Sequence, residues 1–175
     1  MRIHQVSVDF VAEEDRLRLR IATTEGAELC FWLTRRYVRL LWPALRSLAE
    51  LANPVVQSAP ARVSPEARKA LVEMEHEEAV KQADFSKPFA PTGAAMPLGG
   101  EPLLLARVQG MRAPDGRPLL AMHTQQGQGL TLNLDALLIH SLMRLLHLAT
   151  AQAQWELGLE LPHVAPAPSA PGALN

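Results

Sequence analysis

Arginines that recur at every second position near the amino terminus are the side chains best placed to do chemistry in this chain. Arg16, Arg18 and Arg20 alternate with leucine and isoleucine, which predicts a strand with one cationic and one apolar face. Trp32 is expected on the cationic side of the next strand. Guanidinium groups bind phosphates and an aromatic ring stacks on an unpaired base, so this face predicts a surface for single-stranded nucleic acid. Pairing of the arginines with Glu28 across the strands explains the pattern equally well.

A second set of basic and titratable side chains follows the edges of two predicted helices. The first helix, over residues 35 to about 51, carries Arg35, Arg36, Arg39 and Arg46. The second helix has one polar arc, at spacings of i, i+4 and i+7, formed by His140, Arg144 and His147. These edges predict an anion or phosphate contact, or a histidine pair that becomes charged below about pH 6.5. The alternative is a solvated stripe whose arginine stems cover apolar surface.

Motifs for catalysis or metal binding are scarce. The chain has no Gly-x-Ser-x-Gly elbow, Walker loop, dinucleotide-binding glycine motif or His-Glu-x-x-His pair. Glu73 and His76 form one Glu-x-x-His unit, but di-iron bundle sites need two such units and two further glutamates, so a solvated helix face is expected. Cys30 is the only cysteine, which excludes an intrachain disulfide and a zinc site with several thiolates. We therefore expect no cofactor, no metal and no enzymatic activity. The alternative is a small-ligand or enzyme site near His123, His140 and His147.

Length and composition bound the remaining classes. At 175 residues with 48% hydrophobic residues, the chain can bury a sizeable core as one domain or as two halves that share an interface. A net charge of -1 argues against binding driven by bulk charge and leaves a local basic patch for nucleic acid. The amino terminus lacks the apolar region of a signal peptide, and no run reaches the ~18 to 20 apolar residues of a membrane span. The expected location is the cytoplasm, without membrane contact.

Two similar segments position these side chains. Residues 28–48 contain an apolar strand that runs through Thr34 into a helix, and residues 129–149 repeat the pattern 101 positions later, with Asp135 at the same switch. The predicted fold is α+β, with two tandem βββα repeats that form antiparallel sheet, helices packed on one face and a connecting helix. The predicted domains are a first repeat, a linker with a helix over 65–84, a second repeat that runs from a strand over residues 103–111 to a last short strand near Leu157, Leu159 and Leu161, and a disordered Pro/Ala-rich tail. They span residues 1–52, 53–102, 103–161 and 162–175 respectively.

The order of these elements resembles a known topology. Antiparallel strands followed by a helix, twice over, are similar to the duplicated arrangement of the Whirly and PUR-repeat families, which bind single-stranded nucleic acid. The resemblance is one of topology and carries over no residue, because the chain has neither family's motifs and shows three clear strands per repeat where those folds have four. It implies that binding of single-stranded nucleic acid is a function to test.

The second predicted helix is apolar around most of its circumference. Such a helix is buried on more than one side, so it packs on the first helix, on another subunit, or on both. The residues expected at a subunit interface are Leu138, Ile139 and Met143. The leading functional interpretation is a non-catalytic binding or assembly protein with an unknown protein partner, which forms a homodimer. The alternative is a single-stranded nucleic acid binding protein that uses the arginine-rich sheet face.

Overall fold

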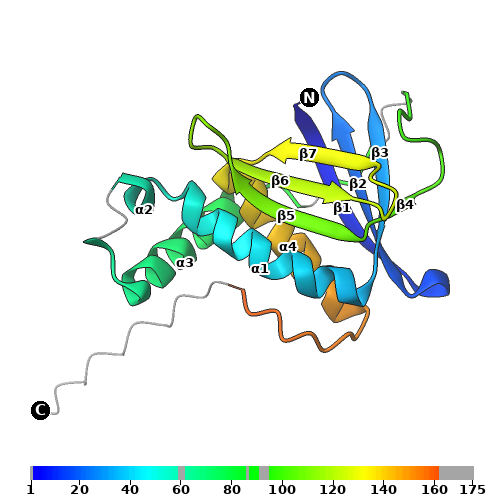
Figure 1. Cartoon of the computed structure of the whole chain (residues 1–175). Helices are drawn as coiled ribbons and strands as arrows, with labels where there is room; N and C mark the ends of the chain where they lie inside the picture. Colours follow the sequence, from blue (N-terminus) through cyan, green and yellow to red (C-terminus); the bar gives the residue numbers. More distant parts are fainter. Residues whose placement is uncertain (1, 59–61, 86, 91–94, 162–175) are drawn as a thin grey trace, which may run out of the picture.

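The amino-terminal part of the chain forms an antiparallel meander because apolar and polar side chains alternate along it. A computed structural model describes residues 2–58, 62–85, 87–90 and 95–161 (Figure 1). The first elements are β1 (Ile3–Val11), η1 (Ala12–Glu14), β2 (Arg16–Thr23) and β3 (Glu28–Leu33). In β2, Leu17, Leu19 and Ile21 are buried, and the arginines between them lie half-buried on the opposite face. The predicted alternation is therefore confirmed.

A second antiparallel meander follows later in the chain. It consists of β5 (Arg107–Arg112), β6 (Pro118–His123) and β7 (Gly129–Asn133). Before it, the two-residue strand β4 (Leu103–Leu104) adds parallel to β3, so the first sheet has the order β1-β2-β3-β4 and the second β5-β6-β7. The chain passes between the sheets after β4, where Leu105 N donates to Trp32 O (3.0 Å) and Ala106 N donates to His123 O (2.9 Å).

Over the described residues, the fold is thus mixed α+β with two sheets, of four and three strands, and four helices. The prediction of one continuous strand from residue 103 to 111 was wrong, because residues 105 and 106 bond to different sheets and divide it. The predicted last strand near Leu159 does not form, since residues 155–161 have no regular secondary structure. The predicted disordered tail, residues 162–175, lies outside the described residues.

Three of the helices begin at residues that the sequence marks as N-caps. The helices are α1 (Arg35–Ala52), α2 (Pro54–Ser58), α3 (Pro65–Gln82) and α4 (Ala136–Gln152). The side chains of Thr34, Ser64 and Asp135 each accept a hydrogen bond from the backbone N–H three residues later, at the starts of α1, α3 and α4. The short α2 lies within the predicted linker, where Asn53 Oδ1 accepts from Val55 N (3.1 Å) and Val56 N (3.2 Å).

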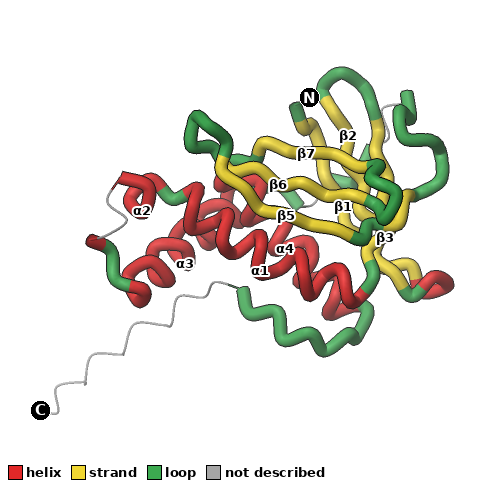
Figure 2. The backbone as a smooth tube through the Cα atoms, in the orientation of Figure 1, coloured by secondary structure: helices red, strands yellow, loops and turns green. Residues whose placement is uncertain are grey.

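Helices α1 and α4 each have their main strand contacts with the sheet that they do not directly follow. The main strand contacts of α1 are with β5 and β6 of the second sheet, and those of α4 are with β1 of the first. Gly110 of β5 allows this approach, because a Cβ there would lie 3.3 Å from Leu48 Cγ of α1. Helices α1 and α4 also contact one another, and α3 covers α4. Figure 2 shows the strands gathered on one side of the molecule and the helices on the other.

The residue Trp155, just after α4, packs against the connection between β1 and β2. Trp155 is buried, its Nε1 donates to Asp15 Oδ1 (3.1 Å), and its ring meets Phe10 edge to face at 6.3 Å. Leucines of both sheets and of α1 and α4 complete one hydrophobic cluster. Within the described residues, no helix combines the length and the apolar character that a membrane span requires.

Candidate functional site

The arginines of β2 are occupied by acidic and polar neighbours. Arg20 Nη2 lies 2.8 Å from Asp9 Oδ2, and Arg20 Nε donates to Ser7 Oγ at 3.1 Å. Arg18 Nη2 lies 3.8 Å from the same Asp9 oxygen, and Arg16 Nη1 lies 3.5 Å from Glu14 Oε2. The partners come from β1 and η1, whereas Glu28 is paired along the sheet with Ala22. Much of the charge that the sequence predicted for this face is therefore compensated within the chain.

The segment after α3 lies over the same face. Gln5 holds it with two hydrogen bonds, from Gln5 Nε2 to Pro88 O (3.0 Å) and from Ala90 N to Gln5 Oε1 (3.1 Å). The ring of Phe89 packs on Arg20, with its centroid 4.3 Å from Cζ. Trp32 is half-buried beside Arg18, its partner in the neighbouring strand. Burial raises the pKa of the Cys30 thiol on this face, which disfavours the reactive thiolate.

The arginines of α1 have a different environment. The exposed residues of this helix include Arg35, Arg36, Arg39 and Arg46. The structure shows no ion pair between any of these four and another described residue. The opposite side of α1 carries Tyr37, Leu41 and Leu45 into the core, so the helix is divided sharply into an apolar and a cationic face. In Figure 1 the cationic helix crosses the front of the molecule.

Within the polar arc of α4, His140 lies in a buried contact between helices, whereas Arg144 and His147 are half-buried. His140 is 0% exposed and His76 of α3 is 5% exposed, and their Nδ1 atoms lie 3.2 Å apart. Since a neutral imidazole carries one proton, one Nδ1 donates and the other accepts. His140 Nε2 lies 3.6 Å from Glu75 Oε2, which accepts a hydrogen bond from Asn53 Nδ2 at 3.3 Å. The expected solvated face at His76 was wrong, because α4 covers it.

This contact explains the acid–base behaviour of His76. Burial lowers the pKa of His76 to about 4, and the nearby positive charges of His140, Arg144 and His147 act in the same direction. Nδ1 of a neutral His76 can accept a hydrogen bond from His140 Nδ1–H, which keeps the pair joined. His140 Nε2 has no hydrogen-bond partner among the described residues. The arrangement favours a structural role, in which imidazoles join α3 to α4.

His147 ends the arc beside a cavity of about 710 Å³ between the helices and the carboxyl-terminal segment. Its Nδ1–H donates to the Leu159 carbonyl oxygen (3.0 Å), which fixes the tautomer. Arg46 and Lys69 line the same cavity, so the structure brings together Arg46 and His147, two of the residues predicted to contact anions. His123 lies in β6 and does not line this cavity. Among the described residues, no group of three His, Cys, Asp or Glu side chains could hold a metal ion.

The residues predicted at a subunit interface lie inside the chain. Ile139 and Met143 are both 0% exposed, because α1, α3 and β1 all pack against α4. Neither side chain can therefore contact a second copy, and this part of the dimer prediction was wrong. Leu138 is half-buried and lines a groove at the edge of the first sheet. The contacts of α4 within one chain account for most of its apolar circumference, while Leu137 and Leu148 remain exposed.

That groove, of about 490 Å³, runs along the outer edge of β1. Seven consecutive residues, Ile3 to Asp9, line it. One wall comes from the segment after α3, with Phe85, Lys87 and Phe89, and the other from α4, with Leu137, Leu138, Ser141 and Leu145. The sequence shows an alternating strand here, but it does not show which segments flank the strand, so the groove was not predicted.

Comparison of the chain with protein-family models, with curated proteins and with solved structures found no match.

Proposed function

We propose that this is a non-catalytic binding protein whose ligand is single-stranded nucleic acid, held along the exposed face of α1. The observation that carries the proposal is the set of four exposed arginines on this helix, which the structure does not pair with any acidic side chain among the described residues. A phosphate backbone offers the charges that these guanidinium groups lack.

The spacing of the arginines suits a linear polyanion. Arg35 and Arg46 lie eleven positions apart in one helix, which corresponds to roughly 16 Å along the axis. Arg39 falls on the same side as both, since four and eleven residues are close to whole turns. An extended strand that follows the helix would therefore meet several cations in succession. The line ends at Arg46, because the cavity beyond it is also lined by Glu50, Glu73 and Glu160, and Lys69 there lies 3.9 Å from Glu73 Oε1.

A stacking partner for a base lies next to the start of α1. Trp32 lies three positions before Arg35 in the sequence, and its side chain is half-buried. Aromatic stacking is tolerant of sequence, and together with cations it is typical of single-strand binding surfaces. In the proposed complex, Trp32 contacts a base and the arginines of α1 contact the phosphates that follow. The β2 arginines stay a predicted contact that would first have to leave Asp9 and Glu14.

The distribution of charge supports the choice of α1. The net charge of the whole chain is -1, and several exposed carboxylates lie on α3, including Glu66, Glu77 and Glu78. The positive charge of α1 is thus a local feature in a nearly neutral molecule. A local cationic strip attracts a polyanion at close range, whereas salt screens it at longer distances.

Duplication of a βββα unit is a further part of the proposal. It is supported by the same order of three strands and a helix in each half and by seven identical pairs between positions 15 and 42 at an offset of 101 positions. Arg39 and Arg46 would then correspond to His140 and His147. In that case the two copies have diverged, since Arg39 is exposed whereas His140 is buried. The ligand is held by the copy whose helix edge remained in solvent.

Fluorescence anisotropy with a labelled oligothymidylate of about twenty nucleotides tests the proposal. We expect binding that weakens as salt is raised from about 50 to about 200 mM, with a slope of about -2 for three phosphate contacts. The triple variant R35Q/R39Q/R46Q should lose at least about tenfold in affinity and most of the salt dependence. These side chains are exposed, so the fold should be unaffected.

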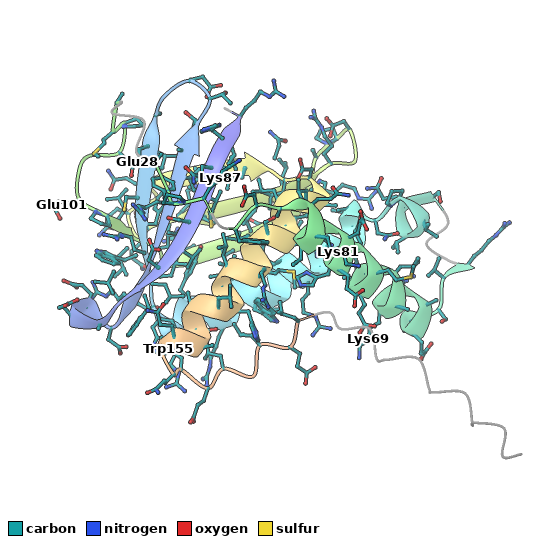
Figure 3. All side chains as sticks on the ribbon, turned by 180° about the vertical axis from the view of Figure 1, so that it is seen from behind. Glu28, Lys69, Lys81, Lys87, Glu101 and Trp155 are labelled. Carbon is teal, nitrogen blue, oxygen red and sulfur yellow. The ribbon has the colours of Figure 1, made fainter. Side chains whose placement is uncertain are left out.

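The matched control removes the same charge elsewhere. Lys69, Lys81 and Lys87 are exposed and lie along and after α3 (Figure 3), and the triple variant K69Q/K81Q/K87Q changes the net charge by the same amount. Under the proposal, the lysine variant retains most of the affinity. No binding by the unmodified protein at low salt, or an equal loss in both variants, would reject it.

Self-association stays a prediction of its own. With Ile139 and Met143 buried, a homodimer would have to use other surfaces. The mass in solution by light scattering addresses it, with a single-chain mass at high concentration as the result that excludes the dimer.

A further inference from the structure

β1 is an edge strand whose outer backbone groups have no backbone partner among the described residues. It pairs only with β2, and none of the hydrogen bonds among the described residues joins the outer edge of Ile3–Val11 to another backbone group. The strand is nine residues long and contains neither lysine nor proline. Natural sheets commonly protect such edges with charge, proline, bulges or a covering segment. In β1 these devices are limited to a register irregularity between Ile3 and Gln5, the charge of Asp9 and the flanking segment that Gln5 holds, and residues Ile3 to Asp9 still line an open groove. Such an edge is suited to pairing with another strand.

The groove beside β1 has the shape that an added strand requires. Seven consecutive residues of β1 line it, so both side-chain faces and the backbone edge are accessible from one space. Phe85 and Phe89 flank the outer face, while Leu138 and Leu145 flank the inner face. Figure 3 shows Lys87, on the segment after α3, beside β1. An extended peptide in this position would place alternate side chains against each wall.

The walls favour a single peptide strand over a second copy of the chain. Helix α4 lies directly against β1, so a second β1 paired edge to edge would bring its own α4 into the space of the first. The groove of about 490 Å³ has room for a few residues of one extended chain.

The charges of the groove define the chemistry of the peptide. Arg20 is paired with Asp9, and Lys87 lies 3.2 Å from Asp84 Oδ2. Asp135 is exposed at the start of α4, where one carboxylate oxygen caps the helix and no cation pairs with it among the described residues. The unmatched charge of the lining is thus negative, which is complementary to a lysine or arginine.

We propose that the groove along β1 binds an extended peptide that adds as a strand to the first sheet, with branched apolar residues at alternate positions and a basic residue that meets Asp135. The backbone amides and carbonyls of the peptide complete the hydrogen bonds of the edge, and its apolar side chains cover the leucines of α4. This site is separate from the cationic face of α1 and does not depend on nucleic acid binding.

The test uses a fluorescein-labelled, acetylated and amidated peptide of sequence Lys-Val-Thr-Val-Thr-Val-Lys with the full-length protein. Two further versions carry N-methyl groups on alternate backbone amides, one on the valines and the other on the threonines. Because alternate amides of a strand point to the same edge, methylation of one set blocks pairing and methylation of the other set does not. Anisotropy should show binding of the unmodified peptide and of only one methylated version.

Three variants locate the site. Leu137→Arg adds a cation to the wall of the groove and should weaken binding at least about tenfold. Leu148→Arg is the matched control, since Leu148 is similarly exposed on the same helix and does not line the groove. Asp135→Ser keeps an N-cap but removes the charge. It should weaken binding of the lysine peptide while leaving binding of a peptide with serine in place of both lysines unchanged.

If the protein binds neither the lysine peptide nor its serine version, the proposal is overturned. Equal binding of the two methylated versions would also overturn it. A stable dimer that Leu137→Arg abolishes would also overturn it, because the groove would then be filled by a second copy. Equal weakening by Leu137→Arg and Leu148→Arg would place the peptide elsewhere on α4.

Discussion

At the residue level, Asp9 controls how many cations the outer face of the first sheet can offer. We expect Asp9→Asn to lower the free energy of unfolding by no more than about 1 kcal/mol, because ion pairs this exposed contribute little. Its affinity for oligothymidylate should stay within about twofold of the unmodified protein, since α1 holds the strand. Urea unfolding and anisotropy measure the two quantities. A large gain in affinity with steeper salt dependence would move the site to β2.

His76 should make the protein less stable in mild acid. The unfolded chain protonates this histidine below about pH 6.5, whereas in the fold its pKa is lowered to about 4. Between these values the unfolded state binds more protons, so stability falls as the pH is lowered through this window and levels off below it. We expect a loss of about 1 to 3 kcal/mol from His76 between pH 7 and pH 4, measured by urea unfolding.

The variant His76→Gln isolates this contribution. Carboxylates with lowered pKa values, such as those of Glu66 and Asp115, also cost stability in acid, and they remain in the variant. The difference between the two pH profiles therefore belongs to His76 and its contact with His140. Parallel profiles would contradict the buried pair.

At the level of elements, local signals predicted the strands and helices well. The capping residues Thr34, Ser64 and Asp135 fix where α1, α3 and α4 begin, and alternation fixes which side of β2 is buried. These features depend on neighbours in sequence, which is why the sequence reveals them. The exposure of the arginines on α1 follows from helical periodicity in the same way.

Features that join distant segments were not predictable. His140 belongs to a polar arc of α4 by periodicity, but its burial depends on His76, which lies 64 positions earlier. The division of one predicted strand into β4 and β5 depends on hydrogen bonds to Trp32 and His123. The groove along β1 likewise combines three separate parts of the chain. A single sequence gives no measure of such proximities.

Gly129, at the start of β7, should be essential for the second sheet. A Cβ at this position would collide with the Met122 carbonyl oxygen and would lie 2.7 Å from His123 Cα, both backbone atoms of β6. We expect Gly129→Ala to lower the free energy of unfolding by about 2 to 4 kcal/mol, because the strands would have to separate. Chemical denaturation monitors the loss.

Gly100→Ala is the control for this substitution. Only the flexible Met96 side chain lies near its Cβ position, at 3.7 Å, so the change should stay within about 0.5 kcal/mol. Equal effects of the two substitutions would mean that β6 and β7 do not approach one another as described.

At the level of the whole molecule, the two halves depend on each other for burial. Helix α1 covers β5 and β6, and α4 covers β1. Helix α1 therefore depends on the second half of the chain for its burial, and α4 depends on the first half. The chain is expected to unfold in one cooperative step, with no folded half left behind.

Cleavage between the halves tests this interdependence. A protease site inserted after Gly100, in an exposed turn, should be cut without loss of the fold, because the contacts between halves persist. The cut protein should elute as one species in size-exclusion chromatography, while each half purified in urea should fail to regain its circular dichroism alone. Independent refolding of either half would show that α1 and α4 do not depend on the sheet of the other half.

The packing of α1 on strands that come later in the sequence also has a consequence during synthesis of the chain. The last strand that α1 covers ends at His123, about 70 residues after the end of α1 at Ala52. At translation rates of about 5 to 20 residues per second, the apolar side of α1 stays uncovered for roughly 4 to 14 seconds before β5 and β6 have been synthesised. During that interval a nascent chain displays Tyr37, Leu41 and Leu45 outside the ribosome. The protein is therefore expected to engage chaperones that bind nascent apolar helices.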